Sequence, residues 1–124
     1  FGFCVMTQYQ YLKGNVLGAV GFHPSLLVSE LRGPSEEDIA QNISYPTLMI
    51  TAENDSDKLK PGGKVALILQ EKFPGEEVAF EIKGAKHGFM VRGNETNDTI
   101  KKAQDAALHK ACDFLGDKIQ PSNT

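Results

Sequence analysis

The sequence predicts an α/β fold with a mostly parallel sheet and flanking helices. Three short apolar runs alternate along the chain with polar segments that have helical character. The apolar runs are nearly continuous, which is typical of strands buried on both faces of a parallel sheet. The chain has 124 residues, enough for one domain with one hydrophobic core.

Each predicted strand is bounded by residues that favour turns. The first covers Val16–Phe22 and is followed by His23-Pro24-Ser25. The second covers Thr47–Thr51, follows Pro46 and leads into an acidic loop. The third covers Val78–Ile82 and leads into the loop Lys-Gly-Ala-Lys-His-Gly. Short apolar runs with such boundaries predict buried strands.

Two helices are predicted between these strands. Ser35–Gln41 is polar, has acidic residues in its first turn and begins with a serine suited to the N-cap. The second helix is opened by Pro61-Gly62-Gly63 and closed by Pro74-Gly75. Its apolar residues recur at helical spacing and are Val65, Ile68, Leu69 and Phe73.

A long amphipathic helix is predicted over Asp98–Lys118. We expect Gly116 to end it and residues 120–124 to form a frayed tail. The apolar side of the helix is predicted to consist of Ile100, Ala103, Ala107, Leu108, Ala111 and Leu115.

Composition excludes several classes of partner. The chain is 40% hydrophobic and 23% charged with a formal net charge of −3, as in an ordinary globular protein. The sequence has no basic patch with interleaved aromatic residues of the kind that binds nucleic acid. It also has no apolar run that approaches the ~20 residues needed to span a bilayer. Two cysteines in an α/β pattern favour a reducing compartment, so we expect a cytoplasmic protein.

Chemically reactive side chains follow the predicted strands. Sites in open parallel sheets form at the carboxyl ends of the strands, and Cys4, His23, Asp55 and His87 are all expected there. A cysteine near a histidine that a carboxylate orients becomes a nucleophile at neutral pH. The chain order of nucleophile, acid and histidine is that of the α/β-hydrolase triad.

Alternatives exist for each member of this triad. His87 could be a surface loop histidine beside solvated Lys86, but its order after Cys4 and Asp55 favours a functional role. Cys4 follows Gly2 in the sequence Gly-Phe-Cys, and taken alone it is better explained as a buried structural cysteine. Asp55 lies in a stretch rich in turn residues, where Glu53 and Asp57 compete for the same role. We favour Asp55, because Asp57 lies later in the loop.

Other candidate residues have weaker support. Arg92 follows the histidine loop and could bind a substrate carboxylate in a bidentate pair, although a solvated loop arginine is nearly as common. His23 could face the same cleft, but we assign it no catalytic role. His109 is expected to face solvent and Cys112 to be packed. The sequence contains no zinc-ligand spacing and no phosphate-binding loop, so no cofactor or metal is implied.

Several motifs resemble those of one enzyme family. They are Gly-Phe-Cys at the start, Phe-His-Pro-Ser after the next strand, Pro-Thr-Leu-Met-Ile-Thr-Ala-Glu-Asn-Asp, and Lys-His-Gly-Phe-Met-Val-Arg-Gly. Together with the last helix they resemble the dienelactone hydrolase family of the α/β-hydrolase superfamily. The resemblance implies that residues 1–119 form the C-terminal part of a partial α/β-hydrolase fold without its N-terminal strands.

The same resemblance implies a function. Cys4 would be the nucleophile, His87 the base and Asp55 its partner in metal-free hydrolysis of a small-molecule ester or lactone. The expected partners include the missing N-terminal half or a second copy. The alternative is a non-catalytic fragment or degenerate paralogue used for packing or partner binding. Met6 favours it, because a nucleophile elbow needs a small residue there.

Overall fold

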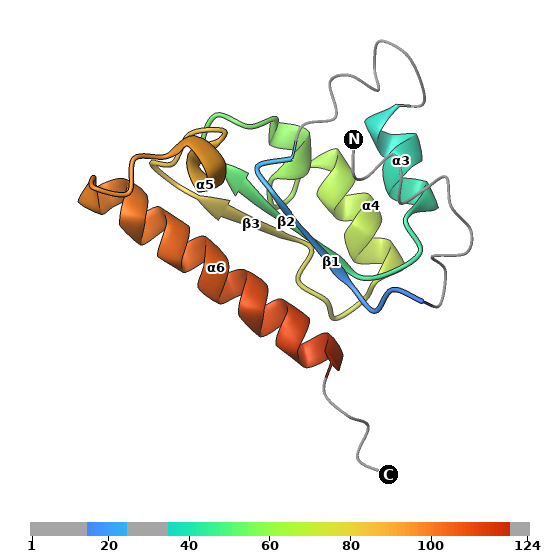
Figure 1. Ribbon diagram of the computed structural model, residues 1–124. Coiled ribbons are helices and arrows are strands. Elements are labelled where there is room, and N and C mark those ends of the chain that lie inside the picture. Colours follow the sequence, from blue (N-terminus) through green and yellow to red (C-terminus); the bar gives the residue numbers. More distant parts are fainter. Residues whose placement is uncertain (1–14, 25–34, 120–124) are drawn as a thin grey trace.

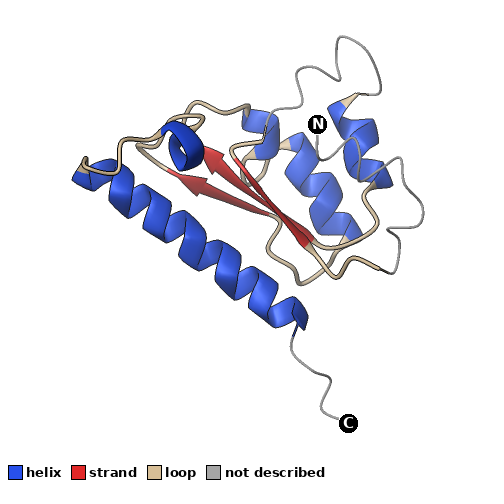
Figure 2. Ribbon diagram, viewed as in Figure 1, coloured by secondary structure: helices blue, strands red, loops and turns tan. Residues whose placement is uncertain are grey.

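The computed structural model describes residues 15–24 and 35–119. In this part three parallel strands form one sheet, in the order β1 (Ala19–Phe22), β2 (Thr47–Ala52) and β3 (Ala79–Ile82). Ala19 pairs with Thr47, and Met49 pairs with Ala79. The predicted parallel sheet is therefore confirmed, and Figure 2 shows its strands running in one direction between helices.

Helices cover both faces of the sheet. Helices α3 (Glu36–Asn42) and α4 (Lys64–Lys72) lie on one face, and α6 (Asp98–Ile119) lies along the other (Figure 1). Connections between neighbouring parallel strands must cross over the sheet: α3 lies between β1 and β2 in the chain, and α4 between β2 and β3. The result is a partial α/β fold of three layers.

The burial of the middle strand, β2, explains why helices cover both faces of the sheet. All six residues of β2 are buried, and side chains alternate between the two faces of a strand. Met49 packs into the core under α3 and α4, whereas Leu48 and Ile50 pack into the core under α6. The buried hydroxyls of Thr47 and Thr51 donate to backbone carbonyls, so the strand carries its polar groups without leaving them unpaired.

Local sequence determines where α3 begins. Ser35 has an extended backbone, and its hydroxyl accepts a hydrogen bond from the Asp38 N–H at 3.1 Å. Such a cap satisfies one of the free N–H groups of the first turn. Three acidic residues follow in that turn, where they complement the positive end of the helix dipole. The predicted start is confirmed.

The last helix differs from its prediction in two ways. It continues through Gly116 to Ile119, so the expectation that Gly116 ends it is wrong. Leu108 and Leu115 are 48% and 37% exposed, whereas Gln104 and Phe114 are buried. The predicted buried side of the helix therefore wrongly included Leu108 and Leu115 and omitted Gln104 and Phe114.

Two short helices were not predicted. They are η2 (Asp57–Leu59) and α5 (Phe89–Arg92). The Ser56 hydroxyl accepts from the Lys58 N–H at the start of η2, so a serine cap was a signal for it. Neither of these, nor any other helix in the described ranges, is long and apolar enough to cross a membrane.

Candidate functional site

Three loops meet at the carboxyl ends of the strands. His23 follows β1, residues 53–55 follow β2, and the loop 83–88 follows β3. Because the three strands are parallel and adjacent, these loops emerge at the same edge of the sheet. The structure thus brings together three of the residues that the sequence placed there, namely His23, Asp55 and His87.

Consecutive residues after β2 tie the acidic loop to the histidine loop. The Glu53 carboxylate accepts a hydrogen bond from the Gly84 N–H at 2.6 Å, and the Asn54 side-chain oxygen accepts from the His87 N–H at 2.7 Å. The backbone N–H of Glu53 donates to the carbonyl of Ala85. The histidine loop is therefore held along its length by residues that the sequence reasoning either gave another role or did not consider.

Asp55 and His87 form the closest polar pair of the site. Asp55 Oδ1 lies 2.6 Å from His87 Nδ1, and Asp55 Oδ2 accepts from the Ala52 N–H at 2.7 Å. The Asp55 side chain is only 3% exposed, whereas that of His87 is 36% exposed. A carboxylate only accepts hydrogen bonds, which assigns the ring proton to Nδ1 of neutral His87 and leaves a lone pair on Nε2.

The two rival acids have other partners. Glu53 binds the Gly84 N–H, as described above, and Asp57 is 96% exposed and pairs with Lys60 at 3.2 Å. The preference for Asp55 over both as the neighbour of His87 therefore agrees with the geometry.

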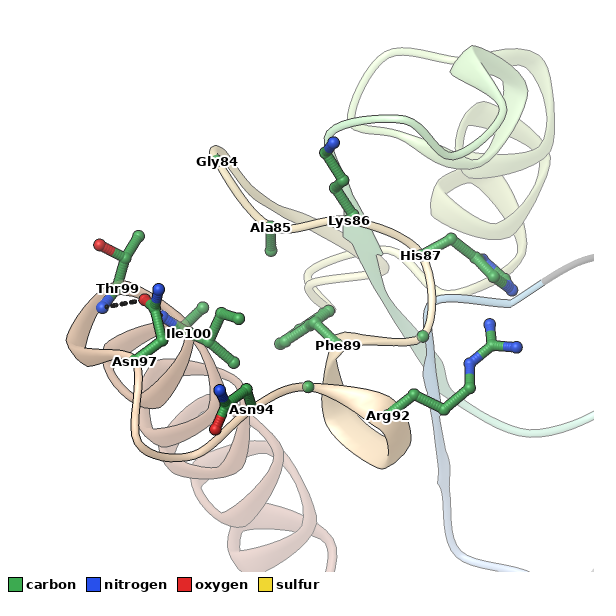
Figure 3. A pocket seen from close by; sticks show the side chains of 13 residues that line it. Gly84, Ala85, Lys86, His87, Phe89, Arg92, Asn94, Asn97, Thr99 and Ile100 are labelled. Atoms are coloured by element: carbon green, nitrogen blue, oxygen red, sulfur yellow. Dashed lines mark hydrogen bonds between the residues drawn. The ribbon is translucent and has the colours of Figure 1, made fainter.

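Gly88 shapes the turn after the histidine. Its φ is +91°, a conformation that residues with a Cβ rarely adopt. A Cβ at this position would also run into the guanidinium of Arg92. Arg92 thus folds back beside the histidine loop, and Figure 3 shows its guanidinium on the same side as the His87 ring. Within the described part of the chain no acidic side chain pairs with it.

A buried amide anchors the short helix that carries Arg92. Gln104 of α6 is 7% exposed, and its side chain donates to the Phe89 carbonyl at 2.9 Å. Gly93 permits this close approach, because a Cβ there would meet the Phe89 carbonyl oxygen. The sequence reasoning missed Gln104. A polar residue among the small apolar residues of the helix was the available signal.

His23 lies against the pair. Its ring centroid is 4.9 Å from that of His87, in an edge-on arrangement with an interplanar angle of 72°. Burial, followed by the charge of nearby His87, lowers the pKa of His23 below its ordinary value of 6.5. The sequence had placed His23 at this edge without giving it a role.

A cavity of about 510 Å³ adjoins the histidine loop. It is lined by the loop 84–89, by Arg92 to Asn94, and by the first turns of α6 (Figure 3). Phe89, Ile100 and Ala103 make much of its wall apolar. Its size falls within the range of ligand pockets.

Cys4, Cys112 and His109 are the remaining residues considered in the sequence. Cys4, the proposed nucleophile, lies outside the described residues. Cys112 is exposed on α6, so the expectation that it is packed is wrong; it falls on the solvent side of the helix, next to buried Ala111. His109 is 82% exposed, as predicted. Residues 15–24 and 35–119 contain no cluster of three or more His, Cys, Asp or Glu that could hold a metal ion.

Comparison with known families identifies the family of the chain. The sequence model of the dienelactone hydrolase family matches residues 1–119. The chain belongs to the dienelactone hydrolase family. A search of curated proteins found no match. Family membership points to hydrolase chemistry in general, and the resemblance inferred from the motifs is confirmed.

Proposed function

We propose that this chain hydrolyses an ester or lactone with Cys4 as nucleophile, His87 as general base and Asp55 as the residue that orients His87. The observation that carries the proposal is the Asp55–His87 hydrogen bond of 2.6 Å at the carboxyl edge of the sheet. In the neutral ring this bond selects the tautomer with the proton on Nδ1 and a lone pair on Nε2, and Nε2 has no hydrogen-bond partner among the described residues. Such an imidazole can accept the proton of a thiol.

The proposed reaction has two steps. In the first, His87 Nε2 takes the Cys4 proton while the sulfur attacks the carbonyl carbon. The C–O bond of the ester then breaks, and His87 returns the proton to the leaving alkoxide, so that a thioester remains on Cys4. In the second step a water molecule gives a proton to His87 and attacks the thioester. The acid leaves and the proton returns to the Cys4 sulfur.

Arg92 and the adjoining cavity support a preference among esters. The guanidinium of Arg92 has no acidic partner in the described ranges, and such a group can hold a carboxylate through two parallel hydrogen bonds. The cavity beside it has apolar walls. We therefore propose that the preferred substrate combines a carboxylate with a small apolar body.

Thiol labelling and ester hydrolysis test the proposal together. A thiol-reactive probe should modify Cys4 faster than Cys112, because only a thiol paired with a base is activated. His87→Gln should slow the labelling of Cys4 and lower the hydrolysis of p-nitrophenyl acetate by roughly 10²–10⁴-fold, the usual contribution of a general base. His109→Gln is the matched control and should change neither, since His109 lies exposed on α6.

Two results would contradict the proposal. Equal labelling of the two cysteines would remove Cys4 as an activated nucleophile. Hydrolysis that survives His87→Gln at full rate would remove His87 as the base. A folded chain that hydrolyses no ester would instead favour the alternative, a non-catalytic member of the family.

A further inference from the structure

His23 occupies an unusual backbone position at the end of β1. Its φ is +37°, and among the described residues other than glycine no other has a positive φ. The His23 N–H donates to the Ile50 carbonyl at 2.7 Å, which continues the pairing of β1 with β2 beyond Phe22. A left-handed conformation is costly for a residue with a Cβ, and such residues often mark functional sites.

The His23 ring contacts two rings that follow β3, those of His87 in the histidine loop and of Phe89 at the start of α5. Its centroid is 4.9 Å from that of His87 and 5.7 Å from that of Phe89, and both contacts are edge-on. Edge-on aromatic pairs at these separations attract each other. Among the described residues, rotation of the His87 ring about its Cβ–Cγ bond is opposed by a single hydrogen bond, the one from Nδ1 to Asp55. A contact with His23 restricts this motion.

The electrostatic surroundings favour a neutral His23. Its Nε2 atom is buried and has no hydrogen-bond partner in the described part of the molecule. A buried N–H without an acceptor is costlier than a buried lone pair that merely lacks a donor. The charged or titratable groups around it are His87, Asp55 and Arg92, of which two carry or can carry positive charge. A neutral His23 ring adds no positive charge beside His87.

We propose that His23 is a positioning residue for His87, whose neutral ring at the end of β1 holds the His87 imidazole in the plane that lets Nδ1 bond to Asp55. The positive φ of His23 accompanies this placement of its ring against His87. That His87 is a catalytic base rests on the proposed function, but the contact itself does not. The role follows from the arrangement of three rings and one carboxylate.

Nuclear magnetic resonance of the histidine rings tests this role without any substrate. The proton on His87 Nδ1, bonded to Asp55, should give a strongly deshielded resonance that Asp55→Asn abolishes. His23→Asn should broaden or remove that resonance while circular dichroism shows a folded chain. Asparagine tolerates a positive φ, so this change removes the ring with little added backbone strain. His23→Phe keeps an aromatic ring and should retain the resonance.

His109→Asn is the control and should leave the resonance as in the unchanged protein. A resonance that persists at full intensity in His23→Asn would overturn the proposal. The result for His23→Asn is sufficient even if His23→Phe does not fold. Loss of the resonance in a folded His23→Phe would also overturn it, because ring packing would then not be what positions His87. Absence of ester hydrolysis together with the expected resonances would sink the proposed function and leave the positioning role standing.

Discussion

At the scale of single residues, three consecutive residues of the acidic loop after β2 each bind a different part of the histidine loop. Glu53 holds Gly84, Asn54 holds the backbone of His87, and Asp55 holds its ring. Asp55 is suited to holding the ring because its carboxylate is almost completely buried and its second oxygen is fixed by the Ala52 N–H. A carboxylate fixed at both oxygens can orient an imidazole with little freedom of its own.

Removing the negative charge of Asp55 should therefore reduce activity severely. Asp55→Asn places an amide beside Nδ1 and favours the wrong tautomer of His87, and the same change in a Ser-His-Asp triad lowers kcat by about 10⁴-fold. We expect a loss approaching this size in steady-state ester hydrolysis. Asp57→Asn is the matched control, since Asp57 is 96% exposed, and it should leave kcat nearly unchanged. Equal losses in the two variants would contradict the assignment.

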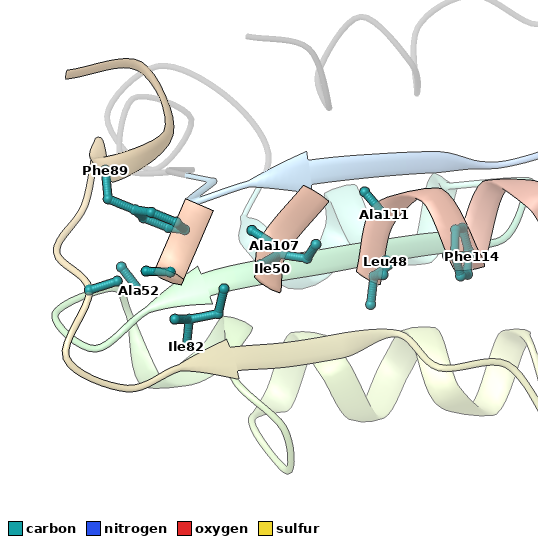
Figure 4. Close-up of a cluster of buried hydrophobic side chains, with 10 residues drawn as sticks. Leu48, Ile50, Ala52, Ile82, Phe89, Ala107, Ala111 and Phe114 are labelled. Carbon is teal, nitrogen blue, oxygen red and sulfur yellow. The ribbon is translucent and has the colours of Figure 1, made fainter. Parts of the chain in front are cut away.

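At the scale of elements, α6 determines how the histidine loop is supported. Its buried side is made of small residues at Ala103, Ala107 and Ala111, which bring the helix close to the sheet, and it ends in the large ring of Phe114. Figure 4 shows Phe114, Ala111 and Ala107 along the helix, over Leu48 and Ile50 of β2. Gln104 then connects this packed helix to α5 through the Phe89 carbonyl.

Two neighbouring positions of α6 separate the buried side from the exposed side. Phe114→Ala should lower the free energy of unfolding by roughly 3–5 kcal/mol, because a large core side chain is lost and a cavity remains. Leu115→Ala should cost much less, since Leu115 is 37% exposed and Phe114 only 7%. Urea unfolding followed by circular dichroism measures both. A larger cost for Leu115→Ala would mean that the helix packs on the side first expected from the sequence.

At the scale of the whole molecule, His23 links the stability of the fold to pH. The pKa of His23 is lowered in the folded chain, chiefly by burial and next by His87. Below its ordinary value of 6.5 the unfolded chain binds more protons than the folded chain at this residue. Stability must then fall as pH decreases from that value to the lowered pKa, and this contribution stays constant below it.

This dependence can be measured by urea unfolding between about pH 8 and pH 5. The free energy of unfolding should decrease toward the acidic end, and His23→Phe should remove that part of the decrease. His109→Phe is the control, because His109 is largely exposed, and it should keep the slope of the unchanged protein. If the free energy of unfolding depends on pH in His23→Phe as it does in the unchanged protein, groups other than His23 cause the loss of stability.

The fold and part of the site could be predicted from local patterns. Apolar runs between turn residues predicted all three strands of the described sheet, and Ser35 predicted the start of a helix. Asp55 and His87 were predicted as partners because parallel strands bring their carboxyl ends to one edge. The exposed side of α6 was predicted less well. Leu108 and Leu115 are apolar, yet only the position of the sheet decides which apolar residues of a helix are covered.

The sequence by itself determined the order of β1, β2 and β3 with the helices α3, α4 and α6, the family, and the loops that carry the reactive residues. These depend on short-range propensities and on motifs that stand in the chain whatever its packing. Only the tertiary structure decided that Asp55 rather than Glu53 or Asp57 contacts His87, that Gln104 supports the loop, and that His23 lies against His87. Each of those contacts joins residues from different elements, so it depends on how the layers pack and not on local spacing.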